Sequence, residues 1–278
     1  RENILASGKI VKPLTGSFDA DTQMELGTEI AKTFRYDFNA GRLDKSVHPF
    51  SSGSNGDSRI TTRINPENPF DCLYSVIHLF ENQIGRSREF CHHLFAKFSA
   101  AFGDQGLDAE TFYATVNRVH PGFIRTESDE VFYNLHVLLR FDLERAMING
   151  DLAVNDLEAA WNDRFATDFG QKVDKAANGV LQDVHWSVGL FGYFPTYALG
   201  NIYAACLFEA MQKALPDTKA NIAKGLLAEP IGWLTKNIHR HGRMVPPVEL
   251  ITNATGRAPD ERPLLAYLNA KFGDIYGF

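Results

Sequence analysis

The side chains best suited to chemistry gather in residues 181–201, whose sequence is LQDVHWSVGLFGYFPTYALGN. This segment combines His, Trp, Tyr, Asp and Phe with three glycines and has no clean helical period. Core helices repeat apolar residues every three or four positions, and solvated loops consist mostly of Gly, Pro, Asn, Asp and Ser. Because the segment fits neither pattern, we interpret it as the wall of a binding or catalytic site.

Metal-assisted hydrolysis is a second chemistry that histidines and carboxylates can support. A catalytic zinc site takes two imidazoles one helical turn apart and a carboxylate, and it leaves one position open for water. His78 and Glu81 are three residues apart and can face the same way on a helix. His92 and His93 follow His78 by fourteen and fifteen residues, which is roughly 20 Å along a continuous helix. An ordinary surface pair is therefore favoured over a zinc site.

Composition and charge exclude several classes of partner. The chain has 278 residues, with 34 acidic against 28 basic side chains, so electrostatics do not favour nucleic acid or an anionic membrane. No apolar run reaches membrane-spanning length and no signal peptide is visible. The chain opens on Arg1 rather than Met, which suggests that something upstream is missing. The three cysteines are too few and too scattered for a disulfide framework. We expect each cysteine to be a small side chain in the core.

Periodicity and turn residues predict a mainly α-helical chain that forms one domain over residues 1–278. The β-branched alternation of residues 59–64 predicts one short strand, and residues 38–56, rich in Gly, Ser and Asn, are expected to form a loop. At most a small β-sheet is therefore expected. Helices are expected at residues 19–34, 69–98, 111–119, 126–150, 155–170, 195–215, 222–227, 231–239, 248–255 and 263–272.

The helix over residues 126–150 is the best specified element. Thr126 with Asp129 resembles a capping box, and Gly150 is a natural stop. An apolar stripe predicts the buried face; its members are Val131, Leu135, Leu138, Leu139 and Leu143. Asn134 and His136 on the same helix are interpreted as neighbours of a site rather than parts of it.

Several short motifs, in order along the chain, resemble the carboxypeptidase Taq family of zinc metallocarboxypeptidases. These motifs are His48-Pro-Phe, Asp57-Ser-Arg59-Ile-Thr, IRTESD at 124–129, His185-Trp186, GYFPTYALGN at 192–201, NIHRHGR at 237–243 and LAYLNAKFGDIYG near the C-terminus. The similarity runs from roughly residue 20 to the end of the chain. It implies a large, mostly helical metallopeptidase domain whose N-terminal helices are truncated here.

The resemblance also shows where the chain departs from the family pattern. The family supplies two zinc histidines and the general base from H-E-x-x-H on a helix, and the third ligand from a later H-E-S segment. Here the sequence reaches His78 as expected, but Leu79 and the following residues resemble the stretch that comes after H-E-S. We therefore expect an internal deletion between His78 and Leu79, with His78 the one zinc ligand that remains.

The recognition residues of the family, in contrast, are present. Arg125 is the candidate for binding a free C-terminal carboxylate, because a guanidinium donates two parallel charge-assisted hydrogen bonds. Without the resemblance, an ion pair with Glu127 or Asp129 would be favoured. Tyr193 would supply a hydroxyl to the same carboxylate or to the scissile carbonyl, although an aromatic residue here is more often core.

His185 would stabilise the oxyanion of a tetrahedral intermediate as a hydrogen-bond donor. The alternative is a ring buried beside Trp186 whose nitrogen is satisfied by a carbonyl. Asp57 and Arg59 would support the metal site, the Asp by orienting a ligand imidazole, and a strand-edge ion pair is the alternative. His48 and His241 are supporting candidates, with His239 and His241 alternatively forming a polar helix end.

Three hypotheses about function remain open at this point. The first is a zinc carboxypeptidase whose catalytic segment is missing from this sequence. The second is a natural deletion variant that binds a peptide or a partner, or oligomerises, without cleaving. The third is an unrelated helical bundle. For the intact enzyme the resemblance implies peptide substrates with a free C-terminal carboxylate, a homodimer and a cytoplasmic setting.

Overall fold

The chain divides into two compact units. The computed structural model describes residues 1–39, 41–46, 51–54, 57–63, 79–242 and 244–278. The first unit contains Arg1–Val11, Asn117–Asn201 and Ala266–Phe278, and the second contains Lys12–Val116 and Ile202–Leu265. Helices dominate both units, which confirms the mainly α-helical prediction, while the expectation of one domain over the whole chain stays a prediction.

Helices of the second unit pack around buried aromatic and aliphatic side chains. Helix α2 begins after Asp19, whose carboxylate accepts a hydrogen bond from the Thr22 amide, as expected of an N-cap. Helices α4 and α5 bury Phe98 and Phe112, whose ring centroids are 5.2 Å apart. Among the described residues, the α-helices that lie wholly within this unit are α2 (Ala20–Thr33), α4 (Arg88–Phe102), α5 (Ala109–Val116), α9 (Thr218–Ala223), α10 (Ala228–Asn237) and α11 (Pro247–Thr255).

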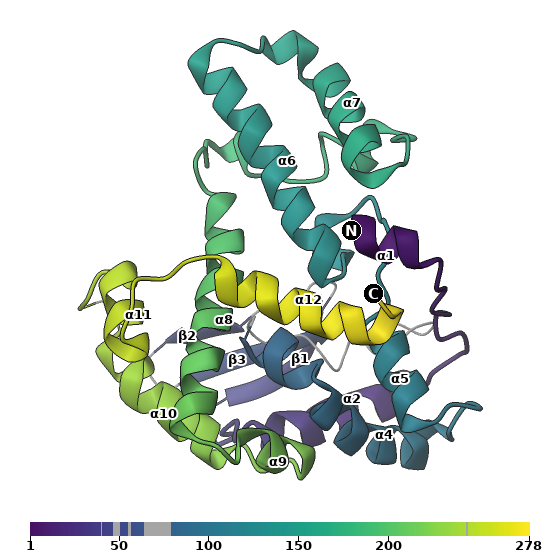
Figure 1. Ribbon diagram of the computed structural model, residues 1–278, viewed down its shortest axis with the longest axis vertical. Coiled ribbons are helices and arrows are strands. Elements are labelled where there is room, and N and C mark those ends of the chain that lie inside the picture. The colour runs from purple at the N-terminus through teal and green to yellow at the C-terminus, as the bar shows by residue number, and fades with distance from the viewer. Residues whose placement is uncertain (40, 47–50, 55–56, 64–78, 243) are drawn as a thin grey trace. The chain divides into compact units, whose positions relative to one another are not determined.

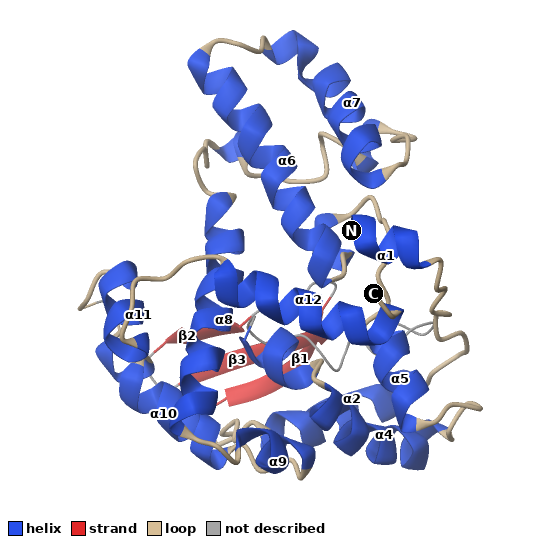
Figure 2. Cartoon of the chain, viewed as in Figure 1, coloured by secondary structure: helices blue, strands red, loops and turns tan. Residues whose placement is uncertain are grey.

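A small sheet also belongs to the second unit (Figure 2). Strand β3 (Asp57–Arg63) lies in the centre, parallel to β1 (Gly41–Ser46) and antiparallel to β2 (Ser51–Ser54). The strand expected at residues 59–64 is confirmed as β3. The prediction of a loop over residues 38–56 is wrong where β1 and β2 form. Pairing with β3 overrides the poor strand propensity of the Gly, Ser and Asp residues in these two strands.

The helix expected to run through residues 69–98 is interrupted within its described part. A π-helical segment, η1, covers Leu79–Gly85. Ser87 then adopts an extended backbone and its hydroxyl accepts a hydrogen bond from the Phe90 amide, so a new helix, α4, begins at Arg88. The predicted face is nevertheless buried at Ile84, Cys91, Leu94 and Phe98. Leu73 and Ile77 lie outside the described residues.

In the first unit, α6 (Glu130–Asn149) packs against α7 (Leu157–Phe169), and Figure 1 shows the two helices side by side. The unit also contains α1 (Glu2–Ser7), the first turns of α8 (Pro195–Ala214) and most of α12 (Arg262–Tyr276). Short 3₁₀ turns cover Arg125–Glu127 (η2), Val154–Asp156 (η3), Ala176–Asn178 (η4) and Trp186–Val188 (η5). The core between α6 and α7 consists of Phe132, Leu139, Leu143, Trp161, Phe165 and Phe169.

The ends of α6 and one face of it differ from the expectation. Asp129, not Thr126, is the N-cap, because its carboxylate accepts from the Val131 and Phe132 amides. Gly150 ends the helix with φ of 81°, as predicted. Leu138 is 47% exposed, so its assignment to the buried face is wrong. Part of the buried face of α6 is instead polar and consists of His136, Arg140 and Glu144.

A buried ion pair joins α12 to the start of α6. The Lys271 ammonium contacts Oε1 of Glu130, and the Tyr267 hydroxyl donates to Oε2 at 2.9 Å. Both charged side chains are 4% exposed. Removal of one member of a buried pair leaves a charge without its partner in a low dielectric, at a cost of about 3–5 kcal/mol.

We therefore expect Glu130→Gln to lower the free energy of unfolding by about 3–5 kcal/mol, measured by urea denaturation. The double variant Glu130→Gln/Lys271→Met should lie much closer to the wild type, because neither charge is then buried alone. Asp151→Asn, on an exposed loop, serves as the control and should change the stability by less than about 0.5 kcal/mol. A double variant as unstable as the single one would contradict the ion-pair explanation.

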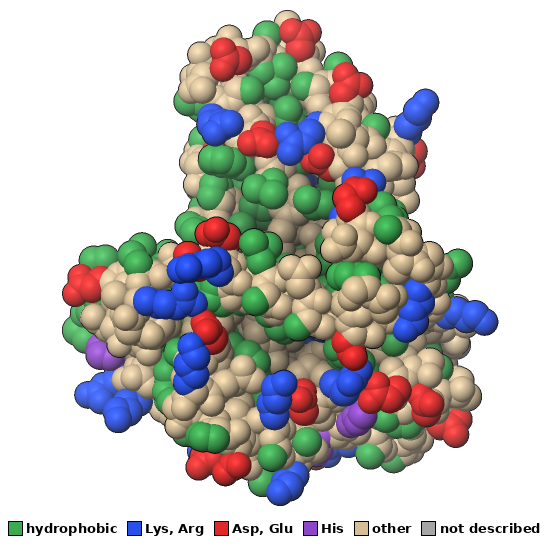
Figure 3. Space-filling view, in the orientation of Figure 1, with side chains coloured by type: hydrophobic (Ala, Val, Ile, Leu, Met, Phe, Trp, Pro, Cys, Tyr) green, Lys and Arg blue, Asp and Glu red, His purple; other side chains and the backbone are tan. Residues whose placement is uncertain are grey.

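Two surface observations bear on possible partners. No helix among the described residues is long and apolar enough to cross a membrane. On the face drawn in Figure 3, basic and acidic side chains lie interspersed, which agrees with the modest net charge of −6. The distribution on this face does not favour a polyanionic partner.

Candidate functional site

A polar stripe on α6 supports the candidate site. His136, Arg140 and Glu144 are four residues apart and share one face of the helix. Their exposures are 0%, 0% and 5%, which is unusual for polar side chains unless they are hydrogen-bonded or paired. Arg140 and Glu144 bind the segment of residues 181–201 that the sequence singled out. The stripe therefore fixes that segment against α6.

Asp183 is the meeting point of two arginines. NH2 of Arg125 donates to Oδ1 at 2.8 Å, and Nε of Arg140 donates to Oδ2 at 2.6 Å. Burial tends to raise the pKa of Asp183, but the positive charges of Arg140 and Arg125 and their hydrogen bonds outweigh it, so the pKa is lowered. Asp183 is therefore a carboxylate at neutral pH, and each of its oxygens is bound by a different guanidinium.

Arg140 is held rigidly by its own helix. Its NH1 donates to the backbone carbonyl of His136 at 2.9 Å and lies 3.2 Å from Nδ1 of the same residue. Nε2 of His136 lies 3.1 Å from the Gly122 carbonyl; a carbonyl only accepts, so we assign the proton to Nε2 and the lone pair to Nδ1. The Arg140 guanidinium also lies 4.6 Å from the Trp161 ring centroid. Burial lowers its pKa to about 10, and it stays charged at neutral pH.

Glu144 fastens the loop that precedes α8. Its Oε2 accepts from Nε1 of Trp186 at 2.7 Å, and its Oε1 accepts from the Gly192 amide. Gly192 has φ of 77°, a left-handed conformation that favours glycine. The one carboxylate thus fixes both ends of residues 186–192. Tyr193 follows directly.

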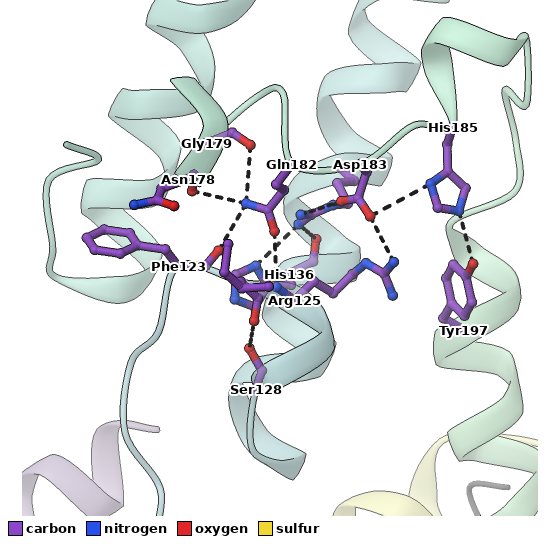
Figure 4. A network of polar contacts seen from close by, with 12 residues as sticks. Phe123, Arg125, Ser128, His136, Asn178, Gly179, Gln182, Asp183, His185 and Tyr197 are labelled. Carbon is purple, nitrogen blue, oxygen red and sulfur yellow. Dashed lines mark hydrogen bonds and ion pairs between the residues drawn. The ribbon is translucent and has the colours of Figure 1, made fainter. Parts of the chain in front are cut away.

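His185 lies between Asp183 and Tyr197 (Figure 4). Its Nδ1 is 3.7 Å from Oδ1 of Asp183, and its Nε2 is 3.0 Å from the Tyr197 hydroxyl. Burial lowers the pKa of His185, which favours the neutral ring. The nearby carboxylate favours a proton on Nδ1, so that Nε2 accepts from the Tyr197 hydroxyl. His185 therefore acts on its surroundings through Tyr197.

Arg125, in η2, faces a set of aromatic rings. Its guanidinium lies 4.6 Å from the centroid of Tyr197, and NH1 donates to the Tyr133 hydroxyl at 3.2 Å. The Arg125 amide donates to the side chain of Gln182 at 3.0 Å, which binds the turn to the 181–201 segment. Arg125 is 6% exposed. Its ion-pair partner is Asp183 rather than Glu127 or Asp129.

The structure brings together three of the residues expected from the sequence. Arg125, His185 and Tyr193 lie in the first unit, with the His185 and Tyr193 rings 5.6 Å apart. Tyr193 is 43% exposed, so it is open to a ligand rather than part of the core. Nε2 of His185 contacts the Tyr197 hydroxyl, whereas the alternative interpretation from the sequence expected a backbone carbonyl there.

The other expected site residues belong to the second unit or fall outside the described residues. His241 lies in a 3₁₀ turn, η6 (His239–His241), of the second unit. Asp57 and Arg59 lie on β3, with Arg59 paired in register to Arg42 and Ser52; their side chains are outside the described part of the structure. His48 and His78 are also outside it. The supporting roles expected for these residues stay predictions.

Sequence reasoning did not identify four members of the site: Asp183, Arg140, Glu144 and Tyr197. A signal for Arg140 and Glu144 was available, because His136, Arg140 and Glu144 repeat at intervals of four on a strongly predicted helix. Asp183 and Tyr197 lie inside the segment already singled out. Nothing in the sequence indicated which of these groups pair with one another.

The described residues do not fit a metal ion of the kind that the resemblance implies. They contain no group of three or more His, Cys, Asp or Glu side chains that could hold a metal. Glu81 accepts from Arg86 at 3.2 Å, and His92 pairs with Glu110 at 2.9 Å. Moreover, no His in the entire sequence is followed by Glu, so the chain has neither an H-E-x-x-H nor an H-E-S motif.

Comparison with known protein families assigns this mostly helical chain to a family of metallopeptidases. A family model described as "Carboxypeptidase Taq (M32) metallopeptidase" matches residues 3–78 and 79–272. The chain belongs to this family, which excludes the unrelated helical bundle. The match divides between residues 78 and 79, where the sequence predicts the deletion.

Curated relatives and a solved structure agree with this assignment. Carboxypeptidase 1 of Bacillus subtilis is 34% identical and thermostable carboxypeptidase 1 of Thermus thermophilus is 35% identical, each over 99% of this chain. The crystal structure of the M32 carboxypeptidase from Deinococcus radiodurans R1 is 35% identical and superimposes with a TM-score of 0.95 over 100% of this chain.

The chain is shorter than these relatives. It spans 63% and 62% of the Bacillus and Thermus proteins and 64% of the Deinococcus chain. The alignment with the Bacillus protein runs over 318 positions, whereas this chain has 278 residues, so at least 40 positions have no counterpart here. A missing internal segment explains an alignment longer than the chain.

His136 makes the stability of the first unit depend on pH. Burial, and next the charge of Arg140, lower its pKa from 6.5 to about 3. The unfolded chain takes up this proton near pH 6.5 but the folded chain only near pH 3. The contribution of neutral His136 is therefore complete above pH 6.5 and is lost as the pH falls toward 3, by about 1.4 kcal/mol per pH unit.

We expect His136→Gln to reduce the slope of unfolding free energy against pH between about pH 6.5 and 4.5, by up to about 1.4 kcal/mol per unit. Urea denaturation at a series of pH values measures this slope. His92→Gln, which removes a half-exposed imidazole, is the control and should change the slope much less. Equal slopes for the wild type and His136→Gln would mean that His136 takes up its proton over the same pH range in the folded and unfolded chains, and would contradict the lowered pKa.

Proposed function

We propose that this chain binds the free C-terminal carboxylate of a peptide, as the recognition part of a zinc metallocarboxypeptidase, and that hydrolysis requires a segment absent between His78 and Leu79. The observation that carries this proposal is the buried pairing of Arg125 with a carboxylate shared by Arg140. It lies beside the exposed Tyr193, within a chain whose family relatives are named carboxypeptidases.

The charge balance around Arg125 favours an anionic ligand. Two guanidinium groups share the single carboxylate of Asp183, so the pair of arginines keeps one positive charge in excess. The Nε of Arg125 is buried without a hydrogen-bond partner among the described residues. A ligand carboxylate would supply both the charge and the acceptor, and a hydrogen bond to a charged group contributes about 1.5–3 kcal/mol.

The neighbouring phenols and imidazole complete the proposed recognition site. Tyr193 would donate its hydroxyl to the ligand carboxylate or to the carbonyl of the last peptide bond. His185 would hold the Tyr197 ring beside the ligand, because its Nε2 accepts the hydrogen of the Tyr197 hydroxyl. Direct donation from His185 to an oxyanion, as the resemblance implies, would require a proton on Nε2 in place of this hydrogen bond. The ring centroids of Tyr193 and Tyr197 are 5.5 Å apart in an edge-to-face arrangement, so the two phenol rings lie next to each other.

Peptide binding tests this proposal without requiring catalysis. Fluorescence polarisation of a labelled short peptide should give a Kd about 10- to 100-fold lower for the free acid than for the C-terminal amide, as expected for charge-assisted hydrogen bonds. Arg125→Gln should abolish this preference. Arg145→Gln on the same helix as Arg140, with a side chain 63% exposed, should preserve it. Equal affinity of the wild type for acid and amide would refute the proposal.

The absent zinc motif leads to a second expectation. The purified chain should contain well under one zinc ion per molecule by elemental analysis, and should release no C-terminal amino acid from a test peptide. The Thermus thermophilus relative provides the positive control under the same conditions. Stoichiometric zinc together with release of the terminal residue by this chain would show that other side chains replace the missing ligands.

Two explanations of the missing segment remain. Either the natural protein contains it and is a zinc carboxypeptidase, or the chain is a natural deletion variant that binds or oligomerises without cleaving. Sequencing of the expressed transcript across the codons for His78 and Leu79 distinguishes them. We further propose a homodimer in a cytoplasmic setting, on the basis of the family resemblance.

A further inference from the structure

Arg140 touches Asp183 but, being fully buried, is not placed to meet a ligand itself. We propose that Arg140 is a positioning residue that holds one oxygen of Asp183 and thereby prevents this carboxylate from neutralising Arg125 completely. Arg125 then remains able to bind an anionic ligand. This inference rests on the proposed function, in which the ligand is a peptide carboxylate.

The geometry divides Asp183 between its two partners. Oδ1 accepts from Arg125 and Oδ2 accepts from Arg140. Each guanidinium therefore binds one oxygen only, although the strongest arrangement for an arginine and a carboxylate is bidentate, with two parallel hydrogen bonds. The site forgoes a bidentate Arg125–Asp183 pair because Arg140 holds the second oxygen.

Arg140 itself has little freedom to move away. The His136 carbonyl and imidazole fix its NH1, and the Trp161 ring lies against its guanidinium. Gly122 in turn fixes the His136 ring through its carbonyl. These contacts belong to α6 and its packing partners rather than to the ligand side. The position of Oδ2 is therefore set by the core of the first unit.

Loss of Arg140 would change how Arg125 pairs with Asp183, although Arg125 itself is not substituted. Asp183 would be free to turn both oxygens toward the Arg125 fork, and a buried bidentate pair is electrostatically strong because the local dielectric is low. A ligand carboxylate would then have to displace an internal carboxylate. Removal of Asp183 as well would remove this competitor and restore the free guanidinium.

Variants of Arg140 and Asp183 test this inference, with the acid-to-amide preference of peptide binding as the readout. Arg140→Met should reduce the preference by about tenfold or more. Arg140→Met/Asp183→Asn should regain the preference. A purely structural role for Arg140 predicts no such rescue, because the double variant disrupts the core further. Circular dichroism verifies that each variant is folded.

Asp183→Asn alone decides the matter if Arg140→Met does not fold. With Arg140 and Arg125 both present and no carboxylate between them, the preference should equal or exceed that of the wild type. A folded Asp183→Asn that loses the preference, or an Arg140→Met that keeps it, would overturn this inference and leave the proposed function standing. A wild type without any preference would overturn both.

Discussion

Asp183 is a carboxylate whose side chain is only 14% exposed, and the candidate site is built around the cost of withdrawing most of that charge from water. A buried charge is tolerated only when it is paired and hydrogen-bonded, and Asp183 obtains both from Arg125 and Arg140. Arg140 in turn requires His136 and Trp161 around it. The position of one carboxylate thus depends on α6, and both Arg125 and His185 lie beside that carboxylate.

The polar stripe of α6 shows how recognition and core packing can share one helix. Leu139 and Leu143 belong to the apolar core shared with α7, and the His136 ring packs against Phe169 of the same core. Arg140 and Glu144 contact the 181–201 segment. Glu144 holds the Trp186 indole and the Gly192 amide, so the loop before Tyr193 is anchored to the same helix. Because these groups are preorganised, binding of a ligand need not pay for ordering them.

Local patterns predict most of the helices, whereas partners distant in sequence escape prediction. The Asp19 cap, the Gly150 stop and the β-branched run of β3 are properties of a few adjacent residues. Strands β1 and β2 form only because β3 is available to pair with them. Ser87 breaks a helix whose apolar face continues across the break, so periodicity alone does not reveal it. Arg125 pairs with Asp183 across 58 residues of sequence, a choice that only tertiary packing makes.

The proposed recognition site and the junction at which the family match divides belong to different units of the chain. The residues around Asp183 derive from α6, η2 and the segment before α8, all within the first unit, and the sequence is intact through these elements. The junction between His78 and Leu79, where the family match divides, lies in the second unit. The contacts that hold Arg125, Arg140 and His185 in place come from residues 122–197. Under the proposed function, absence of a segment at this junction would remove metal ligands and leave the contacts of this buried network in place.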